Sequence, residues 1–97
     1  MTRRPSDGLR DKFDAGKQSA DLQGTVTSVH EVRAEIVVAL RGVRRDLDQI
    51  DRAAERNDVA WLQGAYRGWQ AERRYLREEA QQLEELRNDV DAFVRGL

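Results

Sequence analysis

Two stripes of apolar residues, spaced alternately three and four positions apart, run along most of the chain. The first stripe consists of Val26, Val29, Ile36, Leu40, Val43, Leu47, Ile50 and Ala54, with Arg33 inserted in it. The second consists of Val59, Leu62, Tyr66, Trp69, Leu76, Ala80, Leu83, Val90, Val94 and Leu97, with Arg73 and Arg87 inserted in it. This spacing is typical of the apolar seam of a coiled coil, so it predicts two long α-helices.

A short polar segment, Glu55-Arg56-Asn57-Asp58, separates the stripes and predicts a reversal of the chain. Asn57 and Asp58 are residue types that cap the first turn of a helix, so the second helix is expected to begin here. We therefore predict an all-α fold, a long antiparallel two-helix hairpin resembling a coiled coil. Its helices are expected over about 25–56 and 58–96.

A turn centred near Asn57 sets the register between the two predicted helices. It places Ile36 opposite Leu76 and Ala80, so that apolar side chains face one another. Two helices cover only one face of each other and leave the rest of their surface in water. We therefore expect the hairpin, residues 25–97, to complete a helical bundle by self-association or by docking on a partner.

Residues 1–24 differ from the rest of the chain because they hold the single proline and few apolar residues. Two interpretations of this N-terminal arm remain open. It is either a flexible tail or a short helix that Ser6 caps and that ends at Gly16. Leu9 and Phe13 would lie one turn apart in such a helix, so they are the residues expected to dock the arm.

Charge and composition narrow the classes of function. The 97-residue chain carries 17 basic and 18 acidic residues, so it lacks the basic excess of most nucleic-acid-binding domains. It has no cysteine, which excludes disulfides and thiolate metal sites. The single histidine, His30, has no second histidine one turn later, as a zinc-peptidase helix requires. We expect no enzymatic activity and no catalytic, cofactor or metal site.

Neither a membrane-spanning helix nor a signal peptide is expected from the pattern of apolar residues. The longest apolar run, Ile36-Val37-Val38-Ala39-Leu40, is far shorter than the roughly 20 residues of a membrane-spanning helix. The N-terminal residues lack the apolar centre of a signal peptide. We therefore expect no membrane span, and a location in the cytoplasm or within a macromolecular assembly.

The segment 59–69 combines small and aromatic residues to an unusual degree. Its small residues recur at every fourth position, a spacing that lets another backbone approach a helix closely. Its aromatic residues flank this ridge, and such side chains carry much of the binding energy at protein interfaces. The predicted partner-contact residues are Trp61, Gly64, Tyr66, Gly68 and Trp69. Tyr66 and Trp69 also lie in the second stripe, so the hairpin core is the alternative for these two.

The chain length, the two-helix plan and the mid-chain tryptophan resemble the small secreted helical-hairpin proteins of the WXG type. Here, however, Trp61-Leu-Gln-Gly64 is one residue longer than that family's motif and lies inside the second predicted helix. Tyr75-Leu-Arg-Glu-Glu79 matches the family's export signal, but it too lies within the helix rather than after it. The sequence therefore does not place the chain in that family.

Taken together, the patterns favour a non-enzymatic structural or interaction protein, a helical-hairpin component of a larger assembly such as a phage particle or a secretion complex. The expected partners are a second copy of the chain, in a homo-oligomer, or another protein. One alternative is a small inhibitor or antitoxin-like regulator that sequesters a target protein. The least favoured alternative is nucleic-acid binding through the basic residues of the arm, Arg3, Arg4, Arg10 and Lys12.

Overall fold

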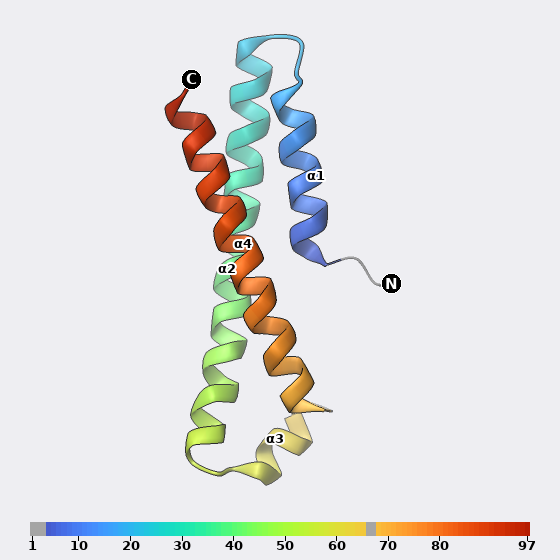
Figure 1. The fold of residues 1–97 in the computed structure, drawn as a ribbon, viewed down its shortest axis with the longest axis vertical. Helices are drawn as coiled ribbons and strands as arrows, with labels where there is room; N and C mark the ends of the chain where they lie inside the picture. Colours follow the sequence, from blue (N-terminus) through green and yellow to red (C-terminus); the bar gives the residue numbers. More distant parts are fainter. Residues whose placement is uncertain (1–3, 66–67) are drawn as a thin grey trace.

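The computed structural model describes residues 4–65 and 68–97, and every regular element in this part of the chain is a helix (Figure 1). The helices are α1 (Pro5–Lys17), α2 (Leu22–Glu55), α3 (Val59–Ala65) and α4 (Trp69–Arg95). The predicted all-α class is confirmed. The molecule is elongated, with extents of 54 × 27 × 15 Å along its principal axes.

The long helices α2 and α4 pack against each other along most of their length and run in opposite directions (Figure 1). α1 packs against both of them at the end formed by the start of α2 and the end of α4. The short helix α3 closes the opposite end, between α2 and α4. The molecule is therefore three helices thick at one end and is closed by a short helix at the other.

Side-chain caps explain where α2 and α3 begin. The backbone N–H of Gly24 donates a hydrogen bond to the Asp21 side chain, which caps α2. The backbone N–H of Trp61 donates to Asp58 Oδ1 at 3.2 Å, in the manner of an N-cap for α3. Between α2 and α3, Asn57 has a φ of 55°, a left-handed conformation that asparagine tolerates better than most residues. The polar segment thus ends one helix and starts the next, as predicted.

The single helix predicted over 58–96 is wrong, because this region forms two helices, α3 and α4. Gly68 precedes α4 with φ 66° and ψ 52°, in the left-handed region. A residue in this conformation cannot continue a right-handed helix. The apolar stripe did not reveal the break because a glycine inside a helix costs only about 1 kcal/mol, which a strong pattern can outweigh.

Two ion pairs define the register between α2 and α4. Arg33 Nε lies 2.7 Å from Asp91 Oδ1, and Arg73 Nε lies 2.6 Å from Asp51 Oδ1. In both pairs, Leu62 is midway along the sequence between the two partners. Two of the arginines that interrupt the apolar stripes therefore pair with carboxylates of the opposite long helix.

The register predicted from a turn centred on Asn57, with Ile36 opposite Leu76, is therefore wrong. The chain reverses around Leu62, which is 1% exposed and belongs to the core. The physical reason is that α3 is part of the reversal. Because α3 forms part of the turn, the reversal is longer than a tight turn at Asn57. Each residue of α2 therefore lies opposite a residue of α4 that comes later in the sequence than predicted.

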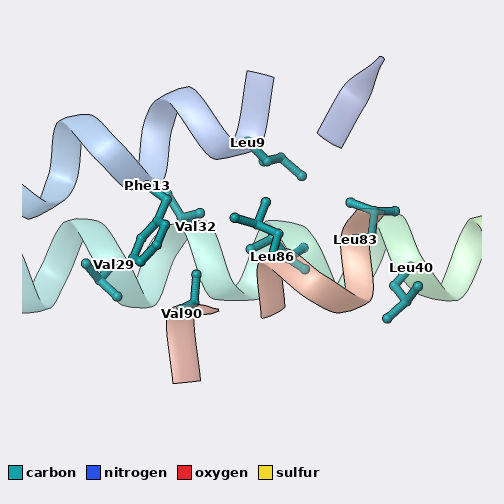
Figure 2. Close-up of a cluster of buried hydrophobic side chains, with 9 residues drawn as sticks. Leu9, Phe13, Val29, Val32, Leu40, Leu83, Leu86 and Val90 are labelled. Carbon is teal, nitrogen blue, oxygen red and sulfur yellow. The ribbon is translucent and has the colours of Figure 1, made fainter. Parts of the chain in front are cut away.

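The larger of two core clusters lies where α1, α2 and α4 meet (Figure 2). It consists of Leu9, Phe13, Val29, Val32, Ile36, Leu40, Leu83, Leu86 and Val90. The side chains that Figure 2 labels come from all three helices and point into one shared space. The second cluster consists of Ile50, Ala53, Leu62 and Leu76, at the α3 end.

Helix α1 is anchored by the two residues that the sequence singled out, Leu9 and Phe13. The Phe13 ring also packs edge-on against Phe93, with ring centroids 5.7 Å apart. The helix starts earlier than expected, with Arg4 rather than Ser6 at its N-cap, and Ser6 is buried inside it. Near its other end, Gly16 is buried, and a Cβ there would lie 3.0 Å from the Ser28 Cβ of α2. A glycine at this position lets the two helices approach closely.

The left-handed backbone of Gly68 leads to a measurable prediction. Gly68→Ala should lower the free energy of unfolding by about 1–2 kcal/mol, because a Cβ is strained in this conformation. Gly64→Ala is the matched control, since Gly64 is helical and a Cβ there meets nothing within 4 Å. It should raise stability by up to about 1 kcal/mol. Urea denaturation followed by circular dichroism measures both, and equal effects of the two substitutions would contradict the left-handed link.

Candidate interaction surface

Helix α3 has only 7 residues and is attached to the rest of the molecule through its packing. Its one buried residue, Leu62, packs in the second core cluster with Ile50 and Ala53 of α2 and Leu76 of α4. A helix this short is not stable alone in water, so this contact is what orders it. The side chains on its other faces are therefore displayed on a defined scaffold.

The predicted partner-contact residues take different positions around α3. Trp61, next to Leu62 in sequence, is 41% exposed. Gly64 and Gly68 are exposed, and an added Cβ at either would meet nothing within 4 Å. Trp69 is half-buried and packs against the second core cluster, as its place in the stripe suggested. Tyr66 lies outside the described residues.

The continuous ridge of small residues predicted on this segment does not form. Gly64 lies in α3, whereas Gly68 precedes α4 in a left-handed conformation. The two glycines are therefore not on one helical face. Trp61 and the exposed surface of α3 remain as the part of the prediction that a partner could contact.

Arginines gather on the first turns of α4, and the apolar stripes did not single them out as contact residues. A shallow cavity of about 390 Å³ is lined by Trp69, Gln70, Arg73, Arg74 and Arg77. Arg73 and Arg77 both lie near Asp51 Oδ1, at 2.6 and 3.6 Å. The signal was available in the sequence, because Trp69, Arg73 and Arg77 follow one another at steps of four, which is one face of a helix.

A second hollow lies between α1 and α2, on a different part of the molecule. This groove has a volume of about 580 Å³ and is lined by Pro5, Gly8, Leu9, Lys12, Ala34, Glu35, Val38 and Ala39. Val38 is 68% exposed, the highest value among the large exposed hydrophobic residues in the described part of the chain. The lining is mostly apolar, so the groove is suited to an apolar side chain rather than to a charged ligand.

The basic residues of the arm are paired with carboxylates of the long helices. Arg4 pairs with Glu78, Arg10 with Asp89 at 3.0 Å, and Lys12 with Glu35 at 3.2 Å; Arg3 lies outside the described residues. These carboxylates offset the positive charge that phosphate groups would need. The arm therefore offers little support for nucleic-acid binding.

A polar cluster around the buried Glu79 joins the start of α1 to α4. Glu79 is 1% exposed, and the Tyr75 hydroxyl donates to its Oε2 at 3.5 Å. Burial and the negative charge of Glu79 raise the pKa of the Tyr75 hydroxyl. The Arg4 guanidinium lies over the Tyr75 ring, 5.2 Å from its centroid. These contacts attach the first turn of α1 to α4 and so serve the fold.

The described part of the chain has neither a cluster of metal-binding side chains nor a helix that could span a membrane. Residues 4–65 and 68–97 contain no group of three or more histidine and carboxylate side chains placed to hold a metal ion. None of the helices in these ranges combines the length and the apolar character needed to cross a membrane.

Comparisons of the chain with family models, with curated proteins and with solved structures found no match.

Proposed function

We propose that this protein is a non-enzymatic interaction protein, a helical component of a larger assembly. In this proposal α2 and α4 act as a hairpin-like, coiled-coil rod that presents α3 at its end. A partner protein then docks on the α3 surface around Trp61. The observation that carries the proposal is the 41% exposure of Trp61 on a short helix that Leu62 anchors in the core.

The physical argument begins with the properties of tryptophan. Its large side chain buries much apolar area and loses few rotamers when it binds, so tryptophan is enriched among residues that dominate interfaces. Trp61 is displayed on a helix that is already ordered by Leu62. Binding here would need no further ordering of α3, which removes one cost of association.

The arginines on the first turns of α4, the helix that follows α3 in the chain, suggest the chemistry of the partner. Arg74 and Arg77 are exposed at the start of α4 and line the cavity next to Trp69. A partner carboxylate at Arg77 would share that side chain with Asp51, whose Oδ1 is 3.6 Å away. A partner that offers an apolar pocket for Trp61 and carboxylates at its rim fits this surface best. Rim charges of this kind speed association and select partners more than they add affinity.

The proposal is tested by photo-cross-linking in cells that produce the protein naturally. A photoreactive phenylalanine analogue at Trp61 should capture a specific partner, whereas the same analogue at the exposed α4 residue Gln81 should not. A single stoichiometric product would favour the regulator that sequesters one target. Products that belong to a particle or complex would favour the assembly component. Equal labelling from both positions would contradict docking at α3.

Once the partner has been identified by cross-linking, Trp61→Ala is expected to weaken the binding of this partner about 30-fold. This is the effect of losing about 2 kcal/mol of binding free energy. Isothermal titration calorimetry measures this change. Because Trp61 is 41% exposed, its replacement should lower the free energy of unfolding by no more than about 1 kcal/mol, less than a core truncation costs. An unchanged affinity would contradict the proposed role.

A further inference from the structure

One face of α2 is exposed and bears a regular order of charges. Its residues follow steps of three and four along the helix: Glu31, Ala34, Glu35, Val38, Arg41, Gly42 and Arg45. At this spacing they share one side of the helix. All of them are exposed except Gly42, which is partly exposed. The face also borders the groove between α1 and α2, because Ala34, Glu35 and Val38 line both.

The charges on this face change sign at Val38. Glu31 and Glu35 precede it, and Arg41 and Arg45 follow it at the same distances. The small residues Ala34 and Gly42 are likewise placed at equal distances on the two sides. A helix face with this order is complementary to itself when the second helix runs in the opposite direction.

We propose that this face binds the same face of a second copy of the chain. In the resulting dimer, the two α2 helices are antiparallel and cross at Val38, about a twofold axis. Glu35 of each copy then lies opposite Arg41 of the other and shares its carboxylate between this Arg41 and Lys12 of its own chain, which is 3.2 Å away. Glu31 lies opposite Arg45. Ala34 lies opposite Gly42, so that small residues meet one turn to either side of the crossing point and let the two backbones stay close there.

The geometry around Val38 supports this contact. Val38 is 68% exposed and stands at the edge of a mostly apolar groove of about 580 Å³. A side chain from the second copy can enter this groove against Leu9 and Ala39. At Gly42, a Cβ would meet nothing within 4 Å, which leaves open space above the helix for another backbone.

The charge order selects a second copy in one orientation. A parallel arrangement in the same register would place Glu35 against Glu35 and Arg41 against Arg41, which is repulsive. Each exposed ion pair stabilises only weakly and is screened by salt. We therefore expect a dissociation constant on the order of 10 to 100 µM that rises with ionic strength.

The α2 face lies apart from the α3 surface on which a partner is proposed to dock. Val38 lies about 25 Å along α2 from the end of that helix at Glu55, at about 1.5 Å per residue. Dimerisation through α2 therefore leaves the α3 surface open. If the dimer is absent, Trp61-dependent partner binding is untouched, so the two proposals fail independently.

The test measures the mass of the full-length chain by sedimentation equilibrium at concentrations up to about 500 µM, above the expected dissociation constant. The wild type should dimerise, and Val38→Arg should weaken the dimer at least tenfold. Val59→Arg is the matched control, because Val59 is 46% exposed but lies on α3, and it should leave the dimer intact. A wild type that stays monomeric over this range would overturn the proposal, as would equal effects of the two substitutions.

Charge exchange then tests the orientation. The variant with Glu31→Arg and Glu35→Arg should be monomeric, and so should the variant with Arg41→Glu and Arg45→Glu. An equimolar mixture of the two should form a heterodimer, and the variant with all four substitutions should dimerise again. Failure of both rescues would overturn the antiparallel pairing. Circular dichroism of each variant confirms that the helices are retained, so a lost dimer is not mistaken for unfolding.

Discussion

Replacing Phe13 by alanine is expected to lower the free energy of unfolding by about 3–5 kcal/mol, the range observed for buried aromatic residues. The Phe13 side chain is 2% exposed and lies in the core shared by α1, α2 and α4. Its truncation removes the edge-on contact with Phe93 and leaves a cavity that three helices would have to move to fill. Urea denaturation followed by circular dichroism measures the change.

The matched control for Phe13 is an exposed apolar residue near the start of α2. Leu22 is 65% exposed, so Leu22→Ala should change the free energy of unfolding by no more than about 0.5 kcal/mol. If both substitutions had a small effect, the docking of α1 would be contradicted and the N-terminal arm would be a flexible tail. Hydrogen exchange of the α1 amides gives a second measurement, since a docked helix is protected and a flexible tail is not.

Leu62→Ala is expected to lower the free energy of unfolding by about 2–5 kcal/mol. Leu62 is 1% exposed and is the one buried side chain of α3. It contacts the cluster formed by Ile50, Ala53 and Leu76, so its loss removes the contact that holds the chain reversal together. The same denaturation experiment measures the effect, and amide exchange in α3 should accelerate more than in α1.

Val59→Ala is the control for this substitution, because Val59 lies in the same helix but is 46% exposed. It should cost no more than about 0.5–1 kcal/mol. If Leu62→Ala were no more costly than Val59→Ala, α3 would not be docked, and the reversal centred on Leu62 would be contradicted. Trp61 would then not be held in a fixed position on α3. The proposed docking at Trp61 therefore depends on the packing of Leu62.

The sequence by itself determined those features that depend on neighbours along the chain. The alternation of steps of three and four places apolar side chains on one face of a helix, and this local rule correctly predicted the helical class. The one-turn spacing of Leu9 and Phe13 likewise identified the two residues that anchor α1. The side chain of Asp58 caps the next helix because its partner, the backbone N–H of Trp61, is three residues away.

Only the tertiary structure decided which positions face each other across the molecule. A seven-residue repeat presents nearly the same apolar stripe after a shift of one repeat, so periodicity alone cannot select the register. The burial of Leu62 and the ion pairs Arg33–Asp91 and Arg73–Asp51 select it, and they join residues far apart in sequence. The break at Gly68 has the same origin, because the packing of α3 against α2 stabilises a backbone that a glycine permits but does not require.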